Sequence, residues 1–313
     1  MIALVRSQLE RLQQAWLSPM PAERLALIRI AVGLYSLYYL IPRQRMFHRI
    51  ARTSEELFAP VGLCHLLPGP ISPLFIDALF VATLICAIFV TIGVGHRYFG
   101  PIFGLSLLAL LSYRNSWSMI LHMHNALVVH AMIIGFTPAA DAWAVRPTRT
   151  TQSTAPSWRY GWAVRLVMAT TLVGYFLSGV AKVLGPQGFA WASGEALRAQ
   201  VAVNAIRYDV LTEVGAAPLF HILFDYEGLF WLMGIATLVL EVGAPLAMTG
   251  PRIGRLWVIA TYGLHWGIFF TMGIKFRYQL SGAAFVAFFG PHALTDTAAN
   301  KATLQRKSSE CAA

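Results

Sequence analysis

Long apolar runs separated by short polar segments constrain the fold of this chain more than any other feature. A helix needs about 20 residues to cross the hydrocarbon core of a bilayer. Candidate runs of roughly that length fall at 24–42, 73–94, 98–113, 117–137, 161–183, 228–249, 254–274 and 278–291. Backbone amides in lipid must be satisfied within their own segment, so these runs predict helices.

We therefore predict an all-α integral membrane protein, a bundle of about eight transmembrane helices. The composition agrees, since 57% of the residues are hydrophobic and only 12% are charged. The third and eighth candidates are short enough to be re-entrant, which leaves six or seven true spans as the alternative. The transmembrane domain is expected over 21–294.

Three further segments flank or interrupt this domain. Residues 1–20 carry apolar side chains at helical spacing among charged ones, which indicates an interfacial helix. Residues 295–313 are polar and are expected to form a disordered tail. Between the fifth and sixth spans, residues 184–228 are too polar for lipid yet rich in Phe, Trp and Tyr. This pattern predicts a long lid or surface helix over the bundle.

The charge and the cysteines exclude several classes of protein. The net charge of +10 comes from Lys and Arg scattered between apolar runs, so the expected partner is the lipid bilayer and not nucleic acid. Cys64, Cys86 and Cys311 form no CxxC and no metal-ligand spacing, and no metal site is predicted. The small excess of basic residues on the side of the N-terminus favours a cytoplasmic N-terminus.

Ionisable residues inside the spans are the first candidates for function, because a charge at mid-bilayer costs about 2.5–3.5 kcal/mol on insertion scales. They are Arg29 in the first span, His122, His124 and His130 in the fourth, Glu241 in the sixth and His265 in the seventh, and the polar but uncharged Asn125 lies beside His124. Arg29 lies near its helix end and is predicted to snorkel to the interface. Glu241 and His265 are predicted to meet inside the bundle, either as a structural hydrogen bond or as part of a functional site.

Lys182 lies in the stretch "YFLSGVAKVLGPQGFAWASG", residues 175–194. A lysine at a helix end with Trp191 nearby is usually an interface anchor. Here Tyr175 shares its face of the helix, the small residues Ser178 and Gly179 permit close approach of another helix, and "GPQG" ends the helix. Partial desolvation disfavours a charged amine, so the alternative interpretation is a catalytic base.

The order of these motifs resembles vitamin K-dependent γ-glutamyl carboxylases and their smaller bacterial relatives with the HTTM (horizontally transferred transmembrane) domain. The likeness rests on "YF", "GV", Lys182 and the following "W" and "G", on "LIRI" in the first span, on "LE" then "P" in the sixth, and on the mid-helix histidine of the seventh. It covers most of residues 20–290.

The resemblance implies that Lys182 deprotonates a reduced quinone, a vitamin K-type naphthohydroquinone. The anion reacts with O2, and the resulting alkoxide removes a proton from a glutamate γ-carbon, which captures CO2 as in a lyase. His124 is the second catalytic candidate, although Asn125 follows it here where the carboxylases have asparagine before it. The implied pocket for quinone and substrate is formed by Tyr175, Asn125, Trp191, Glu241 and His265.

The same resemblance implies a multi-pass protein of the bacterial inner membrane whose active face is extracytoplasmic. The carboxylases carry a large lumenal domain with no counterpart in these 313 residues, so the substrate can be a peptide or a small molecule. Two alternatives stay open. One is a membrane haem or quinol redox protein with axial ligands among the span histidines. The other is a transporter or assembly partner in which Glu241, His265 and Arg29 line a path or stabilise the bundle.

Overall fold

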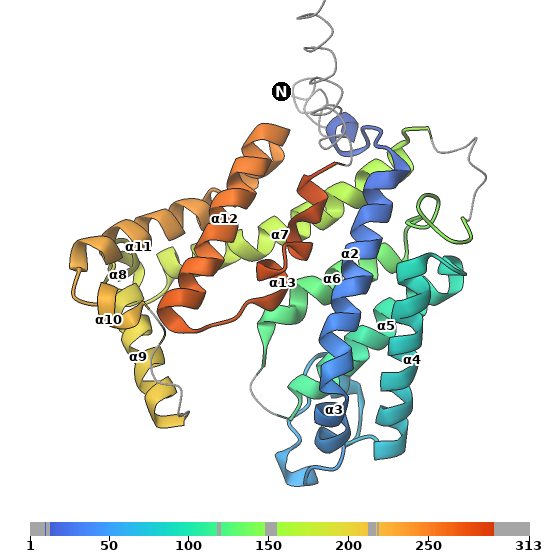
Figure 1. Cartoon of the computed structure of the whole chain (residues 1–313), viewed down its shortest axis with the longest axis horizontal. Coiled ribbons are helices and arrows are strands. Elements are labelled where there is room, and N and C mark those ends of the chain that lie inside the picture. The colour runs from blue at the N-terminus through green and yellow to red at the C-terminus, as the bar shows by residue number, and fades with distance from the viewer. Residues whose placement is uncertain are drawn as a thin grey trace, which may run out of the picture. The chain divides into compact units, whose positions relative to one another are not determined.

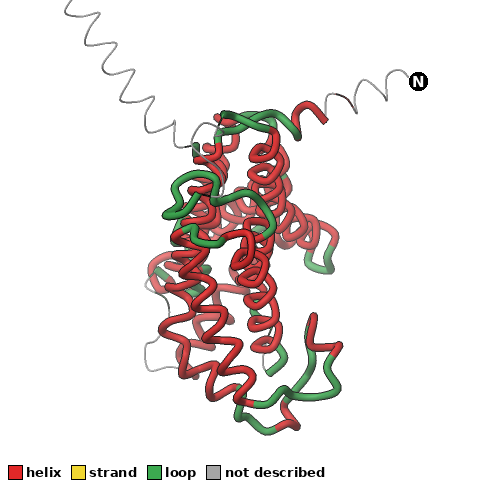
Figure 2. Tube along the Cα trace, turned by 90° about the vertical axis from the view of Figure 1, so that its right-hand side faces the viewer, coloured by secondary structure: helices red, strands yellow, loops and turns green. Residues whose placement is uncertain are grey.

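The computed structural model describes residues 10, 13–117, 120–147, 155–211, 217 and 219–290. These residues are helical or in loops, with no strand among them and a single isolated bridge between Met20 and Ser157 (Figure 2). The chain divides into two compact units. Among the described residues, the first comprises those within 10–121, 128–167 and 289–290, and the second those within 122–127 and 168–288. The predicted all-α class is confirmed for the described part of the chain.

The first unit is a bundle of long helices. It contains α2 (Ala22–Leu40), α3 (Gln44–Ile50), α4 (Pro73–Ile92), α5 (His96–Asn115), most of α6 (Asn125–Gly135) and the first part of α7 (Trp158–Leu184). α4 packs against both α2 and α5 (Figure 1). Ser72 caps α4 by accepting a hydrogen bond from the amide of Phe75 at 3.4 Å, and Gly93 ends the helix in the left-handed conformation at φ 75°.

Two glycines let α5 and α6 approach closely. A Cβ added at Gly100 of α5 would lie 2.6 Å from the carbonyl oxygen of Gly135 in α6. Small residues at such crossings bring helix backbones into direct contact.

The prediction that Arg29 snorkels to the interface is wrong. Its side chain is completely buried, and its Nη2 donates a hydrogen bond to the carbonyl oxygen of Trp143 at 2.5 Å. The loop after α6 therefore supplies an acceptor that no helical periodicity could reveal. Arg29 links the first span to this loop instead of anchoring it at an interface.

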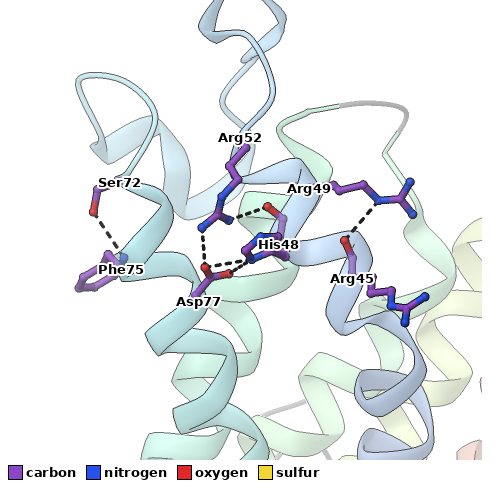
Figure 3. Close-up of polar contacts among 7 residues, drawn as sticks. All are labelled: Arg45, His48, Arg49, Arg52, Ser72, Phe75 and Asp77. Carbon is purple, nitrogen blue, oxygen red and sulfur yellow. Dashed lines mark hydrogen bonds and ion pairs between the residues drawn. The ribbon is translucent and has the colours of Figure 1, made fainter.

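A carboxylate in the first turns of α4 is neutralised by the preceding segment. Arg52 Nη2 donates to Asp77 at 2.9 Å, and His48 Nδ1 lies 3.1 Å from the same carboxylate (Figure 3). Arg45 and Arg49 of α3 point away from Asp77 in that view. The network ties the segment after α3 to the start of α4.

The second unit holds the rest of α7 and a series of shorter helices. These are α8 (Gly188–Ala192), α9 (Glu195–Leu211), α10 (Phe220–Leu223), α11 (Glu227–Val242), α12 (Pro251–Met272) and α13 (Arg277–Leu280). α8 and α9 pack on α11, and α9 and α10 on α12. A core of Val201, Phe230 and Met272 lies beneath them. The segment predicted as a lid thus forms helices packed on α11 and α12.

The predicted count of eight spans is wrong. Among the described residues, three segments are long and apolar enough to cross a membrane: Ala22–Ile50, Pro73–Ile92 and Trp158–Leu184. The fourth candidate is helical only from His122, and its α-helix α6 has 11 residues. The sixth shortens at Val242 because Pro245 turns the chain into a 3₁₀ helix at Ala244–Met248. The eighth breaks at Gly282, at φ 78°, between α13 and a 3₁₀ helix at Ala283–Phe288.

The structures predicted for the two ends of the chain stay predictions. Most of the interfacial helix 1–20 and the whole of the tail 295–313 lie outside the described residues.

Substituting Gly100 tests the α5–α6 contact. Gly100→Ala should lower the free energy of unfolding in detergent by about 1–3 kcal/mol, because the methyl group overpacks against backbone. Gly263→Ala in α12, where no atom lies within 4 Å of the added Cβ, is the matched control and should be neutral or slightly stabilising. Equal melting temperatures for the two variants would contradict the close approach.

Candidate functional site

An ion pair between two helices of the second unit forms the centre of the site. Lys182, in the last turn of α7, places its Nζ 2.7 and 2.6 Å from the two carboxylate oxygens of Glu241, near the end of α11. Nζ also donates to the hydroxyl of Ser178 at 2.9 Å, and that hydroxyl lies 3.3 Å from the same carboxylate. The three donors of the ammonium therefore each have an acceptor.

The pair is largely removed from solvent, since 17% of the Lys182 side chain and 9% of the Glu241 side chain are exposed. Two opposite charges in contact at that burial interact much more strongly than a surface pair. The sequence predicts a partly desolvated lysine at this position, and the structure adds the carboxylate that faces it.

Gly179 makes this contact sterically possible. A Cβ at Gly179 would lie 2.8 Å from Glu241 Cβ and 2.8 Å from the amide nitrogen of Val242. α7 and α11 therefore touch one turn before the lysine, where helix periodicity also brings Ser178 toward Glu241. The prediction that Ser178 and Gly179 permit close approach of another helix is confirmed, and the helix is α11.

Trp191 covers the ammonium. Its ring centroid lies 5.1 Å from Lys182 Nζ, within the range of a cation–π interaction. Trp191 belongs to the short helix α8, which packs directly on α11. Two glycines allow this, since a Cβ at Gly194 would collide with the backbone of Phe230 and one at Gly234 with the carbonyl oxygen of Trp191.

A second polar contact lies on the same face of α7. The hydroxyl of Tyr175 is 2.6 Å from Nε2 of His265 in α12. Aromatic rings surround this contact: Trp257 is 5.1 Å from Tyr175, and Phe276 is 5.0 Å from His265, centroid to centroid. His265 Nδ1 is buried and has no hydrogen-bond partner among the described residues. The site thus combines two proton-carrying pairs with an aromatic wall.

The predicted pairing of Glu241 with His265 is wrong. Glu241 bonds to Lys182 and Ser178, and His265 bonds to Tyr175. Both residues are buried and belong to the same unit, so their burial was predicted correctly. The prediction failed because each of them bonds to a different partner. The charge decides the outcome, because a buried carboxylate gains more from an ammonium than from a neutral imidazole.

The other predicted residues lie on the segment 122–127. His124 is buried in the 3₁₀ helix His122–His124, which packs on α13, and Asn125 is exposed at the start of α6. The ring of His122 lies 6.4 Å from Phe276, the same ring that contacts His265. His130 belongs to the first unit. The structure thus places two sets of contacts on one face of α7, Lys182 with Glu241 and Trp191 and Tyr175 with His265, and Asn125 lies at an exposed position.

Sequence reasoning missed the aromatic wall and the bridging role of Ser178. Ser178 stands one turn before Lys182, a spacing that indicates a shared face. Trp257, Phe276 and Phe285 carry no such local signal, because they approach Tyr175 and His265 from distant segments.

The chain belongs to the HTTM domain family, whose model matches residues 17–251. No curated protein and no solved structure matches the chain. The family match, together with the three apolar helices, indicates a membrane protein.

Removing the carboxylate tests the energetic role of the pair. Glu241→Gln should lower the free energy of unfolding in detergent by about 3 kcal/mol, because it leaves a buried ammonium without a counter-charge. Glu227→Gln is the matched control, since Glu227 pairs with Arg198 at 2.6 Å but its side chain is 77% exposed. Glu227→Gln should lower the free energy of unfolding by less than about 1 kcal/mol.

A double variant separates the cost of burying charge from the loss of packing. Lys182→Met combined with Glu241→Leu should be more stable than Glu241→Gln alone, because two apolar side chains leave no unpaired charge. A double variant less stable than Glu241→Gln would show that the pair is a net stabilising contact.

Proposed function

We propose that this protein is an integral-membrane enzyme resembling vitamin K-dependent carboxylases, in which Lys182 and Glu241 together act as the base toward a reduced quinone. The observation that carries the proposal is the contact of both Glu241 oxygens with Lys182 Nζ beneath Trp191. The resemblance adds the bacterial inner membrane, an active face outside the cytoplasm, and O2 and CO2 as co-substrates. The acceptor is a peptide or a small molecule.

The residues present fit an isoprenoid quinone. A flat aromatic ring system is accommodated by aromatic side chains, and Trp191, Trp257 and Phe285 surround the polar contacts of α7. The buried Nδ1 of His265 offers one more polar atom to a bound molecule. A reduced naphthoquinone, when bound, supplies the acidic hydroxyl and the reactivity toward oxygen.

The pair can accept a proton as a unit. In the charged form Lys182 is an ammonium and Glu241 a carboxylate, and moving one proton along the 2.6 Å contact gives a neutral amine and a carboxylic acid. Both forms hold the same number of protons, so each can accept one more proton from a bound hydroxyl. A hydroxyl proton taken by either form leaves Lys182 protonated and Glu241 neutral.

The remaining site residues have supporting roles in this proposal. Trp191 limits water around Nζ, which strengthens the electrostatic interactions there. Tyr175 and His265 form a second proton-carrying pair on the same helix face and orient a bound hydroxyl. His124 remains a predicted catalytic residue, supported by the resemblance and by its burial next to α13.

Lys182→Arg tests the role of the amine. Arginine keeps the positive charge and the contact with Glu241 but does not release its proton near neutral pH. Oxygen consumption by the purified protein with a reduced naphthoquinone should fall by at least about 100-fold, the scale of general-base loss. The oxygen consumption of Lys182→Ala and of Glu241→Gln should fall by as much.

Lys275→Arg is the matched control, because Lys275 also lies over an aromatic ring, that of Phe269 at 5.2 Å, but outside the proposed site. It should keep wild-type turnover, and melting temperatures identify variants that fail to fold. Wild-type turnover in Lys182→Arg would assign Lys182 to a structural role. A wild-type protein that consumes no oxygen would contradict the quinone-dependent reaction itself.

A further inference from the structure

A cavity lies wholly within the first unit and has no part in the proposed reaction. Its volume is about 280 Å³, and it lies where α5 begins, α6 ends and α7 begins. It is lined by His96, Arg97, Pro101, Gly135, Phe136, Thr137, Pro138, Asp141 and Arg159. A cavity of this size accommodates a headgroup-sized ligand.

Two arginines give this cavity its charge. Within the described part of the chain, the guanidinium groups of Arg97 and Arg159 have neither an ion pair nor a hydrogen bond. Asp141 is the carboxylate among the lining residues, and it is buried and already accepts a hydrogen bond from the Tyr160 hydroxyl at 2.9 Å. The fixed charges on the lining therefore sum to a positive value, which favours an anion.

His96 adds a polar atom without a partner. It is 4% exposed, and its Nε2 lies 3.1 Å from the carbonyl oxygen of Ile134 and 3.2 Å from that of Thr137. Since both partners are carbonyls, Nε2 carries the hydrogen. Nδ1 is buried with no hydrogen-bond partner among the described residues, and as the acceptor nitrogen it can receive a hydrogen bond from a hydroxyl of a ligand but cannot donate to a phosphate oxygen.

The backbone contributes in the same direction. His96 is the first residue of α5, a helix of 20 residues, and the first amides of a helix have no intrahelical acceptor. The positive end of the helix dipole thus lies at the arginine-lined cavity.

We propose that this cavity binds a phosphate group, and that an anionic phospholipid headgroup supplies it. Arginine forks match phosphate oxygens in geometry and charge. Apolar side chains beside the cavity favour a lipid over a free ion: Phe136 lines it and is 59% exposed, and the outer face of α5 exposes Tyr98 and Ile102. The acyl chains lie along these side chains while the phosphate enters between Arg97 and Arg159.

The test measures binding of dioctanoyl phosphatidylglycerol to the purified full-length protein in detergent. Arg97→Gln and Arg159→Gln should each raise the dissociation constant about tenfold, the effect of losing a charge-assisted hydrogen bond. Arg146→Gln is the matched control, because Arg146 is exposed on the loop after α6 and does not line the cavity. It should bind as the wild type does, and all three variants should keep the wild-type melting temperature.

Two further arms identify the source of the phosphate. Lipid binding that millimolar inorganic phosphate does not displace assigns the site to the lipid headgroup, whereas displacement assigns it to the phosphate ion alone. The proposal is overturned if neither probe binds, if the cavity variants bind as the wild type does, or if Arg146→Gln weakens binding as much as they do. Oxygen consumption plays no part in this test, so its outcome is independent of the reaction proposed at Lys182.

Discussion

A charge buried in an apolar bundle requires a partner, and this requirement shapes the second unit. Lys182 and Glu241 satisfy it by direct contact at 2.6 Å, which joins the end of α7 to the end of α11. The contact needs Gly179 at the crossing, and α8 with Trp191 lies over it. The same requirement acts in the first unit, where the completely buried Arg29 donates a hydrogen bond to the backbone carbonyl oxygen of Trp143.

Local patterns predicted those parts of the site that one helix determines. Tyr175, Ser178 and Lys182 share a face because they are spaced by three and four residues, and the sequence around Gly185 and Pro186 ends the helix. The partners were beyond this reasoning. Glu241 is 59 positions from Lys182, and His265 is 90 from Tyr175, so only the packing of α7, α11 and α12 decides which polar groups meet.

Hydrophobicity predicted the helical class and the three long apolar helices but overestimated the number of spans. It measures the apolar character of a run and is insensitive to where the backbone leaves the α conformation. Pro245 and Gly282 interrupt two of the runs, and the run at 117–137 gives an α-helix only from Asn125. Such irregular backbone is tolerated at membrane depth where protein packs around it. The broken segments 122–125 and 273–282 carry His122 and Phe276, whose rings lie 6.4 Å apart, and Phe276 also contacts His265.

The amino acid at position 182 bears on whether the ion pair is only structural or can also accept a proton. Arginine would hold a carboxylate through two parallel hydrogen bonds and would stay charged, so it is the better residue for a fixed ion pair. At position 182 a single nitrogen instead contacts both oxygens of Glu241 and the Ser178 hydroxyl, and it can pass a proton to either. The ion pair is therefore compatible with the proposed role of Lys182 as a base, because its contact with Glu241 also offers a path for a proton.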